Sequence, residues 1–230
     1  MKKAVFLFDI DDTCYNGYSP GDLMKAEVAG GFYKKEEMDG LIADLKEKYM
    51  EKEPYEELAE LYVRDMAKIL AGKDRNILYE HAKTVFEKNI DKLNDFLPAI
   101  IDRYGKTHDF YFVSGGFDYS VQAVADIFGA AGYAATTLKT KDGVYQNEII
   151  KDMSYAADKS REAEIIMKKY PKKGSIAFGD ATADAGMMKF TEFGIYVHPN
   201  DKVKELAAKN GWNVVDDRKA VFQKVVDLLG

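Results

Sequence analysis

Residues 4–13 read AVFLFDIDDT, a stretch in which five apolar residues run directly into acidic ones. A short apolar run that ends in a polar cluster is typical of a strand buried on both faces of a parallel sheet. Residues 110–113, 175–178, 194–197 and 213–215 repeat the apolar pattern, and residues 133–138 do so more weakly. The sequence therefore predicts a set of parallel strands, of which residues 4–8 form the first.

Helical patterns alternate with these strands, at residues 119–128, 159–169 and 203–209. Such alternation predicts an α/β fold with an open, parallel, Rossmann-like sheet and helices on both faces. Residues 19–94 differ, because apolar residues such as Leu41, Leu45 and Leu58 recur there at helical spacing without a convincing strand. We expect a catalytic core of residues 1–18 and 95–230, with residues 19–94 as an α-helical cap inserted after the first strand.

Composition narrows the class of protein. The 230 residues carry a formal charge of −6 with their lysines scattered, which argues against nucleic acid as a partner. The one cysteine, Cys14, cannot form an internal disulfide. No apolar run approaches the length of a membrane span, so we expect no membrane partner and a cytoplasmic protein. The oligomeric state is unknown from the sequence.

Two carboxylates follow the first predicted strand. Asp9 and Asp11 alternate, so both can face the same way as the chain leaves the sheet. Neighbouring carboxylates repel unless a cation or a proton lies between them. One interpretation is a nucleophile, Asp9, beside a general acid and base, Asp11, with Mg²⁺ shared with a phosphate ligand. The other is a solvated acidic turn at a strand end.

Polar residues also follow the second strand, at the edge where the active sites of open α/β sheets lie. Ser114 and Gly115 lead toward a predicted helix, whose unpaired amides can hold a phosphate oxygen. An ordinary turn with a helix cap fits the same residues. Lys159, near the start of a later helix, can direct its ammonium at the same phosphate or remain a solvated surface charge.

Two further carboxylates, Asp180 and Asp184, follow a later strand. If a helix begins there, they lie about one turn apart and can approach a common ion. Mg²⁺ prefers oxygen ligands and keeps several waters, so a few carboxylates are sufficient to bind it. An acidic helix start, favoured by the helix dipole, is the alternative.

The four motifs occur in a characteristic order: Asp-x-Asp-x-Thr from Asp9, Ser-Gly-Gly from Ser114, then Lys159, then Gly-Asp-x-x-x-Asp ending at Asp184. This order resembles the haloacid dehalogenase superfamily over nearly the whole chain outside the cap. The spacing is most similar to the phosphoserine-phosphatase-like branch, whose members carry a helical cap between the first and second motifs. Residues 197–201 and 210–212 are also similar to that branch.

The resemblance implies a phosphoric monoester hydrolase that acts on a small phosphorylated metabolite in two steps. Asp9 would attack phosphorus and become an aspartyl-phosphate. Asp11 would protonate the leaving alcohol and then deprotonate the water that cleaves the acyl-phosphate.

The resemblance also implies binding roles for the matching residues. Ser114, the amide of Gly115 and Lys159 would hold the phosphoryl oxygens. Mg²⁺ would be bound by Asp9, the main-chain carbonyl of Asp11, Asp180 and, directly or through water, Asp184. Without that cation, the carboxylates would repel a phosphate.

Other functions remain open. A dehalogenase belongs to the same superfamily, but Asp11 argues against it because a halide leaves without a proton. A phosphomutase or phosphotransferase would use the same machinery with a different acceptor, and a binding protein could keep the fold without turnover. Turnover of an aryl phosphate with Mg²⁺ would separate an active enzyme from such a binding protein.

Phosphoserine phosphatase proper is a further alternative. Enzymes of that kind have a glutamate and an asparagine where this chain has Tyr18 and Ala183, so we expect a different substrate. Arg64 either supplies a cation for a substrate carboxylate or is a solvated helix residue. Several tyrosines of the cap either line a less charged pocket or pack its core: Tyr33, Tyr49, Tyr55 and Tyr62.

Overall fold

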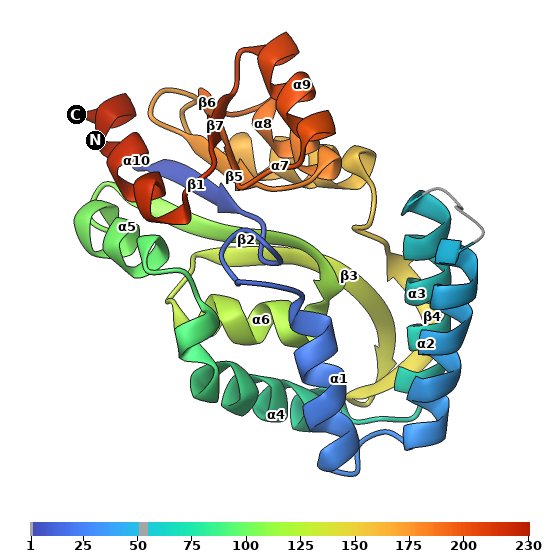
Figure 1. The fold of residues 1–230 in the computed structure, drawn as a ribbon. Coiled ribbons are helices and arrows are strands. Elements are labelled where there is room, and N and C mark those ends of the chain that lie inside the picture. Colours follow the sequence, from blue (N-terminus) through green and yellow to red (C-terminus); the bar gives the residue numbers. More distant parts are fainter. Residues whose placement is uncertain (1, 51–54) are drawn as a thin grey trace.

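The computed structural model describes residues 2–50 and 55–230, and its core is built on one twisted sheet (Figure 1). Within the described residues the sheet has seven strands in the order β4-β3-β2-β1-β5-β6-β7. Their bounds are β1 Ala4–Phe8, β2 His108–Phe117, β3 Gly132–Lys141, β4 Val144–Lys151, β5 Ile176–Gly179, β6 Phe193–Val197 and β7 Asn213–Val215. All neighbouring strands are parallel except β3 and β4. The predicted α/β fold with an open, mainly parallel sheet is confirmed.

The central strand β1 is buried on both faces. Its side chains alternate, so Phe6 and Phe8 join one apolar cluster whereas Val5 and Leu7 join another on the opposite face. The first cluster includes residues of α5 (Phe96–Tyr104), α6 (Asp118–Ile127) and α10 (Val221–Leu229). The second includes residues of α7 (Ala156–Met167), α8 (Ala185–Met188) and α9 (Asp201–Asn210). Helices therefore cover both faces of the sheet, as predicted.

Strand order brings the motifs together. From β1 the chain continues to β2 on one side and later to β5 on the other, and both strands pair with β1 in parallel. The carboxyl ends of these three strands consequently lie side by side at the middle of the sheet. Open sheets bind their ligands at such a change in strand order.

The segment between β1 and α5 is helical within the described residues. It contains α1 (Ser19–Ala29), α2 (Lys35–Met50), α3 (Tyr55–Leu70), α4 (Arg75–Lys88) and the short η1 (Ile90–Lys92). In Figure 1, α2 and α3 lie side by side near β4, whereas α4 lies along α6. The helical content agrees with the predicted insertion, while the boundaries of 19 and 94 stay a prediction.

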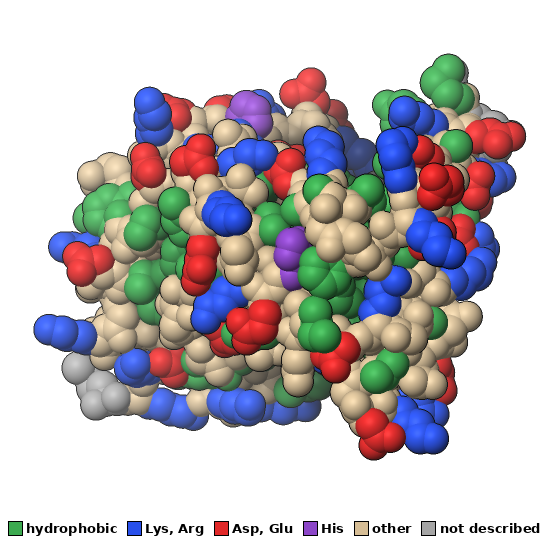
Figure 2. Space-filling view, turned by 90° about the horizontal axis from the view of Figure 1, so that it is seen from below, with side chains coloured by type: hydrophobic (Ala, Val, Ile, Leu, Met, Phe, Trp, Pro, Cys, Tyr) green, Lys and Arg blue, Asp and Glu red, His purple; other side chains and the backbone are tan. Residues whose placement is uncertain are grey.

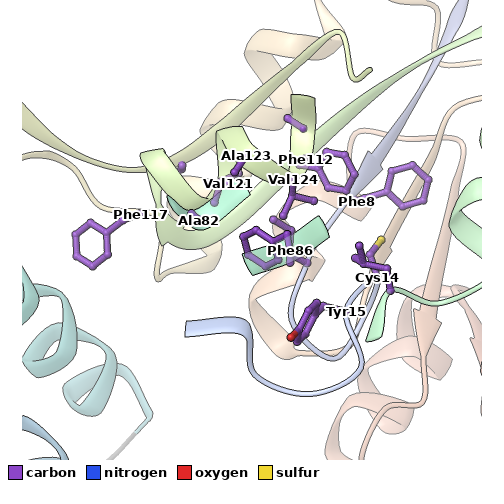
Figure 3. Packing of buried hydrophobic residues seen from close by; sticks show 14 of the residues in the cluster. Phe8, Cys14, Tyr15, Ala82, Phe86, Phe112, Phe117, Val121, Ala123 and Val124 are labelled. Atoms are coloured by element: carbon purple, nitrogen blue, oxygen red, sulfur yellow. The ribbon is translucent and has the colours of Figure 1, made fainter. Parts of the chain in front are cut away.

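Helix α4 packs into the same apolar cluster as the sheet. Its side chains Ala82 and Phe86 are buried, and the ring of Phe86 meets the ring of Tyr15 edge-on at 6.0 Å (Figure 3). Cys14 is also fully buried in this cluster. Burial raises the pKa of its thiol, so Cys14 is a packed, protonated residue in this fold.

The hairpin of β3 and β4 was not predicted from the sequence. Its two-residue turn, Asp142-Gly143, has positive φ at both positions, 52° and 82°. A turn with two positive φ values matches the twist of antiparallel strands, and Asp-Gly favours it. The result is an antiparallel edge strand on an otherwise parallel sheet.

The surface is mixed in charge. Figure 2 shows acidic and basic side chains interspersed over the face that is seen from below. Each helix in the described part of the chain is too short or too polar to cross a bilayer.

Candidate active site

Three carboxylates gather at the carboxyl ends of β1 and β5. Asp9 directly follows β1, and its amide donates to the carbonyl of Phe178 at 3.0 Å. Asp180 directly follows β5, and Asp184 ends the short helix η2 (Thr182–Asp184). One carboxylate oxygen from each of Asp9, Asp180 and Asp184 lies within 4.8 Å of the others. The sequence motifs are thus joined in space.

Burial and proximity disfavour the ionised forms of Asp9 and Asp180. Burial raises the pKa of Asp9 well above its ordinary value; the ammonium of Lys159 opposes this shift, and the neighbouring carboxylates add to it. Burial, and then Asp184, raise the pKa of Asp180 to about 7. Clustered oxygen donors that repel one another are suited to a hard divalent cation, so the three side chains fit Mg²⁺.

Lys159 lies inside this cluster. Its Nζ donates to Oδ1 of Asp9 at 2.6 Å and to Oδ1 of Asp184 at 2.6 Å, and its side chain is buried. Burial by itself lowers the pKa of Lys159, but the contacts with Asp184 and Asp9 outweigh that effect and raise it. The solvated surface lysine considered from the sequence is therefore wrong for this fold, whereas a role in binding phosphate stays a prediction.

Two glycines leave the room that Asp184 and Lys159 need to lie this close together. A Cβ on Gly179 would lie 2.2 Å from Cγ of Asp184, and a Cβ on Gly186 would lie 2.2 Å from the carbonyl oxygen of Ala156. The first glycine leaves room for the carboxylate of Asp184. The second lets α8 approach the start of α7, the helix that carries Lys159.

Asp184 is also tied to the backbone. Its Oδ2 accepts from the amide of Asp180 at 3.1 Å and from the amide of Ala181 at 3.0 Å. These bonds fix the carboxylate through one oxygen, while Oδ1 faces Lys159. Asp184 therefore stabilises the turn after β5, the same turn that carries Asp180.

Asp11 lies beside the carboxylate group but outside it. Its Oδ1 accepts from the amide of Ser19 at 2.6 Å. Burial is the largest cause that raises its pKa, to about 6, and the bonds from Ser19 oppose the shift. Its predicted ligand atom, the main-chain carbonyl, is not part of the carboxylate group, so this coordination stays a prediction.

The Ser-Gly-Gly motif lies within a strand, whereas the sequence predicted it at the start of a helix. Ser114, Gly115 and Gly116 belong to β2, where the pairing with β3 shifts between Val113 and Phe117. Helix α6 begins only at Asp118, so Ser114 and Gly115 are not at a helix N-terminus. Two bonds hold this arrangement: the amide of Gly116 donates to Oγ of Ser114 at 3.1 Å, and Oγ1 of Thr136 on β3 donates to the carbonyl of Gly115 at 2.8 Å.

All predicted site side chains border one cavity of about 390 Å³. This volume is at the small end of the range for ligand pockets. Its lining includes the predicted residues Asp9, Asp11, Ser114, Gly115, Lys159, Asp180 and Asp184. The chain thus brings four separate motifs to one concave surface.

Sequence reasoning assigned no role to two residues that support the site. The hydroxyl of Thr13 is buried and lies 3.4 Å from Oδ2 of Asp9 and 3.4 Å from Oδ1 of Asp180. Arg218 donates to the carbonyl of Asp12 at 3.0 Å. Thr13 stands inside the quoted motif and could have been found there, whereas Arg218 comes from the far end of the chain.

The family model for haloacid dehalogenase-like hydrolases matches residues 6–189, a span that contains every site residue predicted from the sequence. The chain belongs to this hydrolase family. Among its curated relatives is phosphoserine phosphatase SerB1 of Mycobacterium tuberculosis, which is 20% identical over 222 residues, covering 94% of this chain and 72% of the relative. The predicted superfamily and its phosphoserine-phosphatase-like branch are confirmed, and with them the class of phosphoric monoester hydrolases.

Solved structures share the fold of this hydrolase. A Bordetella pertussis Tohama I protein of unknown function aligns with a TM-score of 0.75 and 20% identity, over 94% of this chain and 99% of that one. A phosphoserine phosphatase solved as a phospho-aspartyl intermediate analogue aligns with a TM-score of 0.60 and 20% identity, over 96% of this chain and 98% of that one. At such identities the likeness establishes the fold and leaves the substrate open.

Proposed function

We propose that this hydrolase is a Mg²⁺-dependent phosphatase that cleaves a small phosphomonoester through an aspartyl-phosphate on Asp9. The observation that carries the proposal is the position of Asp9. It is a buried carboxylate at the end of the central strand, it borders the cavity, and it contacts Lys159 and the acidic pair of Asp180 and Asp184. A carboxylate in such a place can act as a nucleophile toward phosphorus.

The acids would hold the metal. Carboxylates of Asp9, Asp180 and Asp184, with the main-chain carbonyl of Asp11, form an oxygen donor set of the kind that Mg²⁺ prefers. When bound, Mg²⁺ supplies the positive charge that lets an anionic phosphate approach these acids.

The reaction divides into two transfers. A carboxylate oxygen of Asp9 bonds to phosphorus while the ester P–O bond breaks, and Asp11 gives its proton to the leaving alkoxide. Water then attacks the phosphorus of the aspartyl-phosphate, Asp11 takes the proton of that water, and the carboxylate of Asp9 is restored with release of phosphate. Ser114, the amide of Gly115 and Lys159 hold the phosphoryl oxygens as charge spreads over them.

The fold alone leaves the acceptor and the substrate open. A phosphotransferase would replace water by another hydroxyl in the second transfer. The name of the mycobacterial relative, phosphoserine phosphatase, makes phosphoserine one substrate to compare. We keep the cytoplasm as the proposed location, on the evidence of the single unpaired cysteine.

The test is phosphate release from p-nitrophenyl phosphate. We expect turnover with Mg²⁺, loss of turnover in EDTA and recovery when Mg²⁺ is restored; Ca²⁺ should fail because its looser coordination misplaces the attacking carboxylate.

Asp9→Asn should lower kcat/KM at least about a hundredfold, since an amide is a poor nucleophile. Asp201→Asn, at an exposed carboxylate on α9, is the control. Full activity in EDTA would contradict the metal, and an active Asp9→Asn protein would contradict the nucleophile.

A further inference from the structure

One wall of the cavity is apolar. Side chains from the loop after β1 and from α1, α2 and α3 line this part of the cavity: Tyr18, Pro20, Leu45, Leu58, Ala59 and Tyr62. A phosphate bound near Asp9 would direct its ester substituent toward this wall. The residues of the wall therefore meet the part of the substrate that leaves.

Among the described lining residues, every charged group belongs to the catalytic core. They are Asp9, Asp11, Asp12, Lys159, Asp180 and Asp184. Asp12 is more than half exposed, and its Oδ1 lies 3.5 Å from Arg218. Lys159 is already bonded to two carboxylates. A charged leaving group would thus lie against the wall without a counter-ion, which is costly.

The cap arginine considered from the sequence does not line the cavity. Arg64 is 55% exposed and pairs with Asp65 at 3.2 Å. The cap tyrosines have different environments. Tyr62 lines the cavity, Tyr33 is buried elsewhere and Tyr49 is exposed. The side chain of Tyr55 lies outside the described residues. The solvated interpretation of Arg64 agrees with this arrangement.

Tyr62 connects the apolar wall to the core. Its ring lies 6.2 Å from the ring of Phe117, which ends β2 just beyond the Ser-Gly-Gly motif. Phe117 is buried, so it gives the tyrosine a fixed surface to pack on. Burial raises the pKa of the Tyr62 hydroxyl well above its ordinary value, and the side chain is therefore neutral. Through Tyr62 the wall packs against the strand that carries the Ser-Gly-Gly motif.

We propose that the cavity selects phosphomonoesters whose leaving alcohol is uncharged and apolar, with Leu58 and Tyr62 as specificity-determining residues. This inference rests on the proposed phosphatase activity. It assigns the substrate class from the lining itself: carboxylates and one paired ammonium come from the core, whereas aliphatic and aromatic surface comes from α1, α2, α3 and the loop before them. A leaving group that carries an ammonium or a carboxylate is rejected because the wall, as far as its residues are described, supplies no partner for it.

The experiment compares alkyl phosphates of similar chain length, so that the chemistry of the ester bond stays similar. The substrates are 2-phenylethyl phosphate, O-phosphoethanolamine and O-phosphoserine, with p-nitrophenyl phosphate as the test of activity. We expect kcat/KM for 2-phenylethyl phosphate to exceed the values for the two charged substrates by about a hundredfold. Equal or higher values for either charged substrate, with p-nitrophenyl phosphate turned over, would overturn this inference and leave the phosphatase standing. No turnover of any of the four would overturn both.

Variants on one helix assign the selection to the wall. Leu58→Ala removes apolar surface from the cavity and should lower the ratio of kcat/KM for 2-phenylethyl phosphate over O-phosphoethanolamine by about tenfold. Leu58→Glu supplies a partner for an ammonium and should lower the ratio further. Leu61→Ala is the matched control, because Leu61 lies on α3 but not on the cavity lining. A ratio that moves equally in Leu58→Ala and Leu61→Ala would overturn the assignment.

Discussion

At the scale of single residues, the site around Asp9 carries more negative than positive charge. Three carboxylates converge there, and Lys159 offers one ammonium between two of them. Burial raises the pKa values of Asp9 and Asp180, and the remaining excess of negative charge adds to this. The same excess would favour a bound cation, as the proposed Mg²⁺ site requires.

Replacement of Lys159 tests this balance. Lys159→Met keeps the length of the side chain and removes the ammonium, which leaves Asp9 and Asp184 buried without their partner. Breaking a buried pair in this way costs about 3 kcal/mol or more of unfolding free energy. Urea denaturation at neutral pH measures the change, with Lys168→Met as control because the Lys168–Glu164 pair is exposed. Equal stability of the two variants would show that Lys159 is not needed to balance the acids.

At the scale of elements, a buried acid lies between α1 and α6. Glu27 of α1 is fully buried, and neither of its oxygens has a partner in hydrogen-bonding geometry among the described residues. Burial raises its pKa to about 7, although the hydroxyls of Tyr119, on α6, and Tyr33 oppose the shift. The interface therefore prefers the protonated carboxyl.

This preference predicts how stability depends on pH. The unfolded carboxyl ionises near its ordinary pKa of 4.5, whereas the folded one holds its proton up to about 7, so stability falls as the pH rises through this window. Glu27→Gln cannot ionise, and its unfolding free energy relative to the parent should rise by about 2 kcal/mol between about pH 5 and about pH 8. Glu80→Gln, at an exposed position of α4, should show no such rise. Parallel curves for the parent and Glu27→Gln would mean that Glu27 is ionised in the native state.

A second prediction at this scale concerns α4. Although α4 lies within the predicted cap, Phe86 is 2% exposed and packs on Tyr15 in the sheet's own apolar cluster. Phe86→Ala should therefore cost about 3 to 5 kcal/mol of unfolding free energy. Ile77→Ala on the same helix should change it by less than about 0.5 kcal/mol, since Ile77 is 57% exposed. A loss below about 1 kcal/mol for Phe86→Ala would separate α4 from the core.

At the scale of the whole molecule, the sequence was informative where a residue's environment is dictated locally. Residues 4–8 are apolar at every position, and β1 occupies these residues. The first inference needed only the apolar pattern. The grouping of Asp9, Asp180 and Asp184 was implied by the family resemblance, and strand ends that meet at one edge of a parallel sheet account for it.

Other features depend on partners that are distant in the chain. Ser114 and Gly115 were expected at a helix start, but bonds from Thr136 and within the motif keep them in β2. Arg218 reaches the loop after β1 from near the other end of the chain. Strand β4 was also missed, but its signal is local. Asp142-Gly143 between two extended runs is a hairpin pattern that could have been recognised in the sequence.

The most direct test of the account is to identify the phosphorylated residue. The protein is quenched during turnover of p-nitrophenyl phosphate with Mg²⁺, reduced with borohydride and digested for peptide mass spectrometry. Reduction of an aspartyl-phosphate gives homoserine, and Asp11→Asn should increase its yield because the second transfer is slowed more than the first. The account predicts homoserine at position 9 in the parent and in Asp11→Asn, and none in Asp9→Asn. Homoserine at another position, or none at position 9 in Asp11→Asn during measurable turnover, would contradict it.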